Sequence, residues 1–190
     1  ATVLRAIDFP AAAAIEAVRA LRAADSHYGF ALATDRGFTH EAGFSERMPV
    51  ARMEPPVVDA LEGHDDAVGA FKLLVFHHHH TSHSLLERIP SVIGPHLAVG
   101  HMGADAVEIG PAGADKGNGL RWLCGHLGID LADVLVFGDE VNDLAMFEVA
   151  GTRVAVANAH PALLEASDAV TSSNADDGVA VFIEELLATG

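Results

Sequence analysis

From residue 115 onward, short apolar segments alternate with helical ones, and this alternation constrains the fold more than any other feature of the sequence. The apolar runs have the length of buried strands, and the segments between them space their apolar residues as helices do. In chain order we expect a helix at 116–127, a strand at 134–137, a helix at 142–149, a strand at 153–156, a helix at 161–166, a strand at 169–171 and a helix at 178–187. Strands that alternate with helices in this way predict a parallel, doubly wound α/β sheet.

The sequence before residue 109 has a different texture, with short strands and helices in irregular order. We expect strands at 2–7, 28–34, 71–76, 96–100 and 104–109, helices at 9–24, 55–62 and 81–89, and a loop or strand at 38–44. Pro55 and Pro56 favour a helix start, and Thr81 is a suitable N-cap. The change of texture predicts two domains, at 1–108 and 109–190.

Composition excludes several classes of partner. The chain has 27 acidic and 11 basic residues and a formal net charge of −16, so a nucleic-acid partner is not expected. No apolar stretch approaches the roughly 18 residues of a membrane helix, and residues 1–10 carry no signal-peptide pattern. Cys124 is the single cysteine, which fits a reducing compartment. We therefore expect a cytoplasmic protein with neither nucleic-acid nor membrane partners.

The residues best suited to chemistry follow the expected strand at 134–137. Ligands bind at the carboxyl ends of strands in open parallel sheets, and Gly138 and Asp139 occupy such an end. Asp139 offers the hard oxygen that Mg²⁺ prefers. Asn142 and Asp143 fall on the first turn of the next helix, where free amides favour anions. Taken alone, these residues would more often be ordinary turn and cap residues.

The sequence around them favours the functional interpretation. Gly-Asp-x-x-Asn-Asp at 138–143 resembles the fourth motif of haloacid dehalogenase (HAD) superfamily phosphatases. Asp115-Lys116-Gly117, preceded by Glu108-Ile109-Gly110, resembles the third motif. Further segments recur in family order at 146–147, 150–151, 154–159, 167–171 and 177–180. The resemblance covers about residues 105–188 and is greatest to the Cof-like, sugar-phosphatase branch, which implies a HAD-like core with an α/β cap domain.

The resemblance implies a role for each of four residues. Lys116 would bind the phosphoryl oxygens, and Asn142 would hydrogen-bond the phosphate or the nucleophile. Asp139 would ligate Mg²⁺, and Asp143 would ligate it or orient its ligands. The implied reaction transfers the phosphoryl group of a small phosphorylated metabolite, such as a sugar phosphate, to an aspartate and then hydrolyses the aspartyl-phosphate.

The family's nucleophile motif, Asp-x-Asp, does not occur in these 190 residues. Asp8 and Asp35 each follow an apolar stretch, but Pro10 and Gly37 stand where the second carboxylate belongs, so both are more typical of turns. We therefore expect a cap at 1–108, a hinge at 108–111 and the C-terminal part of the core at 109–190, with the nucleophile absent from this chain. A missing core segment or an oligomer partner would then cover the exposed sheet edge.

The sequence leaves two alternative functions possible and does not decide the role of one further motif. A non-catalytic HAD-like fragment that binds phosphate or a partner would keep the same fold, and the phosphorylation domain of a cation-pumping ATPase shares a similar Gly-Asp-x-x-Asn-Asp segment. The histidine tract 77–80, with His83, is either a transition-metal site or an exposed or engineered loop.

Overall fold

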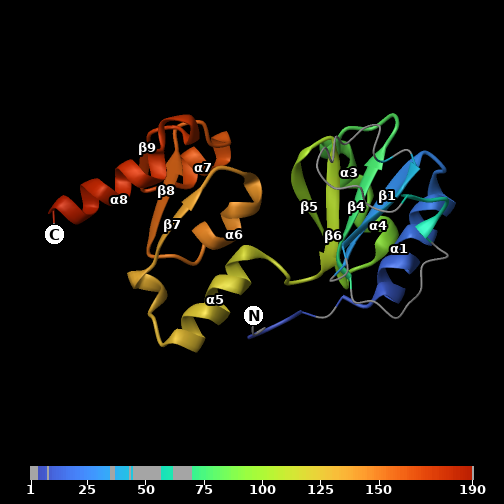
Figure 1. Cartoon of the computed structure of the whole chain (residues 1–190), viewed down its shortest axis with the longest axis horizontal. Helices are drawn as coiled ribbons and strands as arrows, with labels where there is room; N and C mark the ends of the chain where they lie inside the picture. Colours follow the sequence, from blue (N-terminus) through green and yellow to red (C-terminus); the bar gives the residue numbers. More distant parts are fainter. Residues whose placement is uncertain are drawn as a thin grey trace. The chain divides into compact units, whose positions relative to one another are not determined.

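A computed structural model describes residues 4–7, 9–34, 37–42, 44, 57–61 and 70–189, and the chain divides into two compact units (Figure 1). The first unit is Ala1–Ala114 and the second is Asp115–Gly190. The division therefore falls later than the boundary after residue 108 that the sequence suggested. The expected hinge at 108–111 lies instead within strand β6 (Ala106–Pro111), which pairs with strands on both sides.

The first unit contains a six-stranded sheet in the order β3-β2-β1-β4-β6-β5. Its other strands are β1 (Tyr28–Thr34), β2 (Gly37–Glu41), β3 (Val57–Val58), β4 (Ala70–His77) and β5 (Leu97–Ala104). All neighbouring pairs are antiparallel except β2 and β3, which are parallel. The helices whose bounds lie within the described residues are α1 (Ala11–Ala24), α3 (Ser82–Arg88) and α4 (Pro90–Ile93).

Successive side chains along each strand point to opposite faces of the sheet, so this unit has a buried cluster on each face. Phe30 and Leu32 of β1 share a buried cluster with Val18 of α1 and Leu85 of α3. Ala31, which points to the opposite face, belongs to a second cluster. The three helices therefore pack on one face of the sheet.

Most expected elements of the first unit are present, and two predictions were wrong. The expected strand at 28–34 has the bounds of β1, and Thr81 accepts a hydrogen bond from the Ser84 amide as the N-cap of α3. Residues 4–7 form no strand, although one was expected at 2–7. Val57–Val58 form a strand rather than part of a helix, because they pair with His40 and Glu41 and this tertiary pairing overrides the local proline signal.

The second unit is a regular parallel α/β structure, as the sequence predicted. Strands β7 (Leu135–Gly138), β8 (Thr152–Val156) and β9 (Ala169–Thr171) form a parallel sheet in that order. The helices are α5 (Lys116–Leu127), α6 (Leu144–Phe147), α7 (Pro161–Ala166) and α8 (Gly178–Thr189), with short 3-10 turns η2 (Leu131–Asp133), η3 (Val141–Asp143) and η4 (Asn174–Asp176). The helix expected at 142–149 is therefore a 3-10 turn followed by the short helix α6.

Local signals account for the ends of α5. Asp115 is its N-cap and accepts a hydrogen bond from the Asn118 amide at 2.7 Å. Gly128 ends the helix in the left-handed conformation, with φ at 70°. This N-cap fixes the position of the next residue, Lys116. No helix in the described part of the chain is both long and apolar enough to cross a membrane.

Candidate functional site

The candidate site lies at the carboxyl end of β7, where Gly138 leads into Asp139. A Cβ on Gly138 would lie 2.7 Å from a methyl carbon of Leu163, 2.8 Å from the Phe147 ring and 2.9 Å from the Cβ of Asp143. The chain passes these three side chains at a distance that only glycine allows. The close packing sets Asp143 directly beside the strand end.

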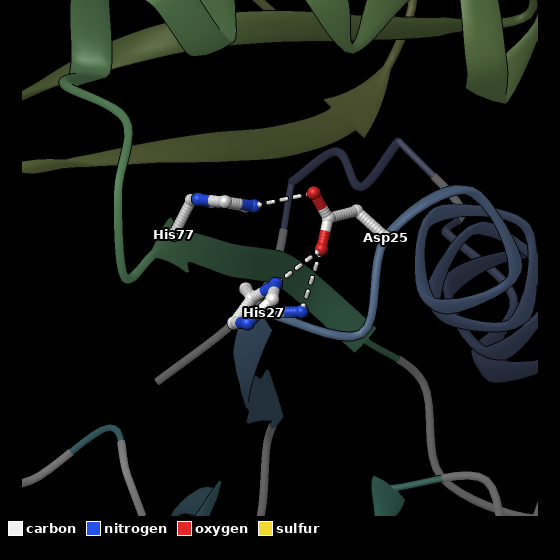
Figure 2. Close-up of side chains that lie close together, drawn as sticks. All are labelled: Asp25, His27 and His77. Carbon is white, nitrogen blue, oxygen red and sulfur yellow. Dashed lines mark hydrogen bonds and ion pairs between the residues drawn. The ribbon is translucent and has the colours of Figure 1, made fainter.

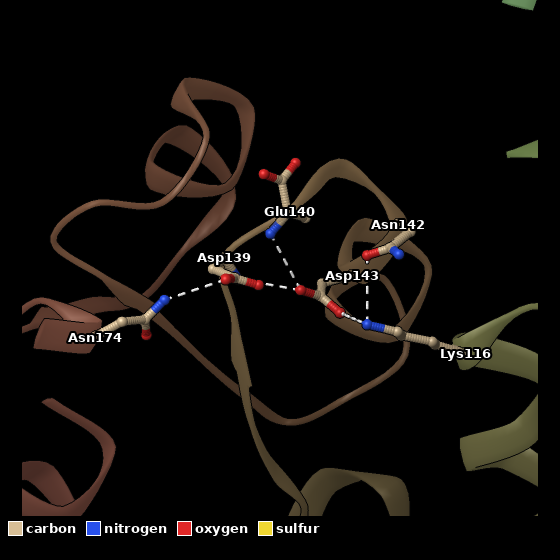
Figure 3. A network of polar contacts seen from close by, with 6 residues as sticks. All are labelled: Lys116, Asp139, Glu140, Asn142, Asp143 and Asn174. Atoms are coloured by element: carbon tan, nitrogen blue, oxygen red, sulfur yellow. Dashed lines mark hydrogen bonds and ion pairs between the residues drawn. The ribbon is translucent and has the colours of Figure 1, made fainter. Parts of the chain in front are cut away.

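Asp143 is the buried centre of the site, with 2% of its surface exposed. Its Oδ2 accepts hydrogen bonds from the Asp139 amide at 3.0 Å and the Glu140 amide at 3.2 Å (Figure 3). Its Oδ1 forms an ion pair with the ammonium of Lys116. Burial alone would raise the pKa of Asp143, but the hydrogen bonds from Lys116 and the two amides outweigh it and lower this pKa below its ordinary value. Asp143 is therefore an anion that ties the loop after β7 to α5.

Lys116 reaches the site from the first turn of α5, and half of its side-chain surface stays exposed. Besides Asp143, its Nζ donates to Oδ1 of Asn142 at 3.3 Å. The ammonium is thus held by two residues of the η3 turn while part of it remains open to solvent. An ammonium presented in this way can accept a phosphoryl oxygen as a further partner.

The loops after β8 and β9 complete the site with two asparagines. Asn174, after β9, donates from Nδ2 to Oδ2 of Asp139 at 3.1 Å (Figure 3). Asn158, after β8, accepts from the Asn174 amide at 2.8 Å. Sequence reasoning assigned no site role to either residue, although the signal was available, because both follow strands at the edge where Asp139 lies.

Asp139 is the side chain best placed to hold a divalent cation. Its Oδ2 is oriented by Asn174, and no hydrogen bond to its Oδ1 is found among the described residues. A partly exposed carboxylate beside the buried Asp143 anion offers hard oxygen donors, which fit Mg²⁺ better than a thiophilic metal. Both oxygens of Asp143 are already engaged, so Asp143 suits the orienting role rather than direct ligation.

The structure brings Lys116, Asp139, Asn142 and Asp143 into one network, as expected from the sequence (Figure 3). Their roles in binding phosphate and metal remain predictions. The two weaker nucleophile candidates, Asp8 and Asp35, lie outside the described residues.

The network joins Lys116 at the start of α5, Gly138 and Asp139 at the end of β7, and Asn142 and Asp143 of the η3 turn. The family model for haloacid dehalogenase-like hydrolases matches residues 2–183. The chain belongs to this family. The match spans residues of both units, whereas the motifs recognised in the sequence began near residue 105.

The chain is also similar in sequence to an individual bacterial phosphatase. The 5-amino-6-(5-phospho-D-ribitylamino)uracil phosphatase of Bacillus subtilis is 47% identical over 92 residues, which cover 48% of this chain and 32% of that protein. This matched stretch thus spans about a third of the relative's length.

Solved structures match nearly the whole chain. TM0651 from Thermotoga maritima superposes with a TM-score of 0.73 at 27% identity, covering 96% of this chain and 69% of that one. The HAD subclass IIB sugar phosphatase BT4131 superposes with a TM-score of 0.75 at 20% identity, covering 94% of this chain and 67% of that one. The predicted fold class, a HAD-like α/β core with an α/β cap domain, is confirmed by these likenesses.

Proposed function

We propose that this chain provides the phosphate- and metal-binding half of a Mg²⁺-dependent phosphatase that acts through an aspartyl-phosphate. The observation that carries the proposal is the buried Asp143 carboxylate. It binds the Lys116 ammonium on one side and the amides of Asp139 and Glu140 on the other. The Asp143 carboxylate therefore positions both the Lys116 ammonium, which would bind phosphate, and the loop that carries Asp139, which would bind the metal. Both groups are in place before a ligand binds, and such preorganisation is what stabilisation of charge in the transition state requires.

In this proposal each side chain has a separate task. Lys116 neutralises the equatorial phosphoryl oxygens, and Asn142 donates a hydrogen bond from its amide nitrogen to the phosphate. Asp139, oriented by Asn174, holds the Mg²⁺, which when bound supplies positive charge to the same oxygens. Asp143 is a positioning residue that orients Lys116 and the loop.

The reaction takes place in two displacements at phosphorus. The first aspartate of Asp-x-Asp attacks the phosphorus as the bond between phosphorus and the leaving oxygen breaks. The second carboxyl of that motif gives its proton to the leaving alcohol and later takes one from the attacking water. Water then attacks the phosphorus of the aspartyl-phosphate, which releases inorganic phosphate and restores the carboxylate. No Asp-x-Asp occurs in the sequence, so we place the attacking aspartate outside these 190 residues.

We propose a small phosphorylated metabolite as the substrate. The Bacillus subtilis relative is named for a phosphoribityl compound, and BT4131 is named a sugar phosphatase. Sugar phosphates are therefore the first class to screen. The acidic composition and single cysteine support a cytoplasmic location for this activity.

A covering partner for the sheet belongs to the same proposal. Within the described residues, β7 pairs on one side only, with β8. Leu186 and Leu187 of α8 are 52% and 76% exposed. The unpaired edge of β7 and the exposed leucines of α8 each favour association with a further core segment or a second chain.

The test is phosphate release from a generic phosphomonoester by the 190-residue chain, with Mg²⁺ and with EDTA. We expect no turnover from the chain alone and Mg²⁺-dependent turnover when a segment carrying Asp-x-Asp is supplied. Turnover by the chain alone would disprove the external nucleophile and direct mutation to Asp8 and Asp35. No turnover with the segment supplied would favour the non-catalytic alternative.

The metal assignment has a readout that does not need turnover. Mn²⁺ is a paramagnetic substitute for Mg²⁺, and its binding to the chain is measured by water-proton relaxation. We expect Asp139→Asn to weaken binding by about tenfold or more, whereas Glu148→Gln, an exposed carboxylate in the same unit, leaves it unchanged. Equal binding by the wild-type chain and Asp139→Asn would exclude Asp139 as a ligand.

A further inference from the structure

A second group of ligand-type side chains lies in the first unit, where α1 turns into β1. Asp25 follows the last residue of α1, and His27 lies two residues further, just before β1. His77 is the last residue of β4, and it pairs across the sheet with Tyr28. Antiparallel pairing of β1 and β4 therefore brings together residues that are about 50 positions apart in the sequence.

The side chains of these three residues converge (Figure 2). One ligand-type atom from each of Asp25, His27 and His77 lies within 4.8 Å of the other two. Oδ1 of Asp25 is 2.7 Å from Nδ1 of His27, and Oδ2 of Asp25 is 3.2 Å from Nε2 of His77. In a tetrahedral Zn²⁺ site with bonds of about 2.0–2.2 Å, neighbouring ligand atoms lie about 3.3–3.6 Å apart. The contact of Asp25 with His77 is already close to that spacing, and its contact with His27 would have to lengthen by about 0.6–0.9 Å to reach it.

His77 supplies an independent reason to look for a ligand. Its side chain is 1% exposed, and its Nε2, which points at Asp25, is buried without a hydrogen bond of acceptable geometry. Buried polar atoms nearly always have such a partner, so an exception calls for a physical explanation. A metal ion between His77 and Asp25 would satisfy this nitrogen.

The protonation states of the group also suit a metal. The amide and ring of His27 hydrogen-bond Asp25 and hold the pKa of that carboxyl well below its usual range, so Asp25 is an anion. Burial lowers the pKa of His77 against the opposing effect of Asp25, which favours the neutral imidazole. Carboxylate and neutral imidazole are the forms that ligate transition metals.

We propose that Asp25, His27 and His77 bind one divalent transition-metal ion, with Zn²⁺ as the best fit. Two imidazoles and one carboxylate favour such an ion over Mg²⁺ or Ca²⁺, which prefer oxygen ligands throughout. The fourth position is open to water or to another imidazole. The rings of His79 and His80 are the nearest sources, with centroids 4.7 Å from His27 and 4.5 Å from His77.

Coordination changes the tautomer of His77. The His79 amide donates to Nδ1 of His77 at 3.1 Å, which leaves the proton of the neutral ring on Nε2. When Nε2 binds the metal, the proton moves to Nδ1 and the His79 amide loses its acceptor. Metal binding therefore rearranges the turn at 78–80 and clamps the end of β4 to the α1–β1 turn.

The site differs from the one that the histidine tract alone suggested. His83 has an 87% exposed side chain and lies 3.7 Å from Glu87, one turn further along α3. Only His77 of the tract belongs to the converging group, and the other two members come from residues that carried no sequence signal.

The test is titration of the 190-residue chain with Co²⁺, a spectroscopic substitute for Zn²⁺, followed by its visible absorption and by competition with Zn²⁺. In the Asp139→Asn chain, which lacks the proposed Mg²⁺ ligand, we expect saturation at one ion per chain. Asp25→Asn and His27→Asn should each weaken binding by about tenfold or more, because each removes a ligand. His83→Asn is the matched control from the same tract and should bind like the wild type. Both ligand variants alter partly exposed side chains, and circular dichroism verifies that they fold.

Three results would overturn the proposal. The first is the absence of saturable Co²⁺ or Zn²⁺ binding, and the second is wild-type affinity in both Asp25→Asn and His27→Asn. The third is an equal loss of metal affinity in His83→Asn, which would assign binding to the histidine tract as a whole. Thermal unfolding gives a second measurement, since Zn²⁺ should raise the midpoint of the wild type and not that of His27→Asn. None of these results depends on Asp139 or on phosphatase activity.

Discussion

The two units assemble polar residues in opposite ways. In the second unit, the site comes from loops at the carboxyl ends of parallel strands, and its central segment is the continuous run Gly138–Asp143. In the first unit, Asp25 and His77 meet because two antiparallel strands pair along their whole length. A parallel sheet concentrates a site into short motifs, whereas an antiparallel sheet can join residues that no motif connects.

The glycines of the two units also differ in what surrounds them. A Cβ on Gly29 of β1 would lie 2.1 Å from a ring carbon of Phe76, so the obstacle there is a side chain. A Cβ on Gly117, Gly151 or Gly178 would lie within 2.2 Å of a backbone carbonyl oxygen. At these three positions the second unit depends on close approach of backbone to backbone, which a larger residue can relieve only by moving a helix or loop, whereas Gly138 packs against side chains.

The strongest test of the comparison is Asp143→Ala in the second unit. It leaves the Asp139 and Glu140 amides without their acceptor and Lys116 without its buried partner, so we expect a loss of about 2–3 kcal/mol in the free energy of unfolding. Urea denaturation measures it, with Glu148→Ala as an exposed control expected to stay within about 0.5 kcal/mol. A loss no larger than that of the control would mean that the network does not hold the loop.

Gly117→Ala against Gly119→Ala tests the backbone contacts of α5. A Cβ on Gly117 would lie 2.2 Å from the Ala145 carbonyl oxygen, whereas one on Gly119 meets nothing within 4 Å. We expect Gly117→Ala to destabilise the protein by about 1–3 kcal/mol through overpacking. Gly119→Ala should stabilise it by about 0.5–1 kcal/mol through helix propensity. Thermal unfolding of both variants gives the comparison, and equal effects would contradict the close approach of α5 to Ala145.

Mild acid should destabilise the first unit more than the second, because His77 lies in the first unit. Its pKa is lowered in the folded state by burial, so protonation favours the unfolded chain. The stability is fully present above the unfolded pKa near 6.5 and declines as pH falls below it. Hydrogen exchange of β1 and β4 amides between pH 7.5 and 5.5, corrected for intrinsic rates, should report this decline, while β8 amides report less change. His77→Asn should flatten the response, and an unchanged slope would assign the decline to other groups.

The smallest effect is expected at the ion pair between Arg153 of β8 and Asp168, which precedes β9. Hydrogen bonds from the Arg153 side chain and amide lower the pKa of Asp168 to about 2. Its contribution to stability is present above the unfolded pKa of 3.8 and is lost as pH falls toward 2. Both side chains are exposed, so 1 M salt should remove most of the effect. Acid titration of the wild type and Asp168→Asn, followed by circular dichroism, should give curves that differ only slightly.

Much of the second unit could be predicted from the sequence, because local signals and tertiary structure agree there. The Asp115 cap and the Gly128 stop define α5, and Lys116, Asp139, Asn142 and Asp143 were named from their motifs. Asn174 was missed as a site residue, since its partner Asp139 lies 35 residues away and their loops meet only because β7 and β9 both pair with β8.

The sequence by itself determined the family, the order of strands and helices after residue 115 and the four residues that form the polar network around Asp143, because each depends on short motifs and on the fixed geometry of parallel strands. Tertiary structure alone decided three other features: the pairing of Val57–Val58 with β2, the place of Ala106–Pro111 in the six-stranded sheet and the convergence of Asp25, His27 and His77. The physical reason is that antiparallel register is fixed by pairing and packing across the whole sheet, so no local pattern specifies which distant side chains will meet.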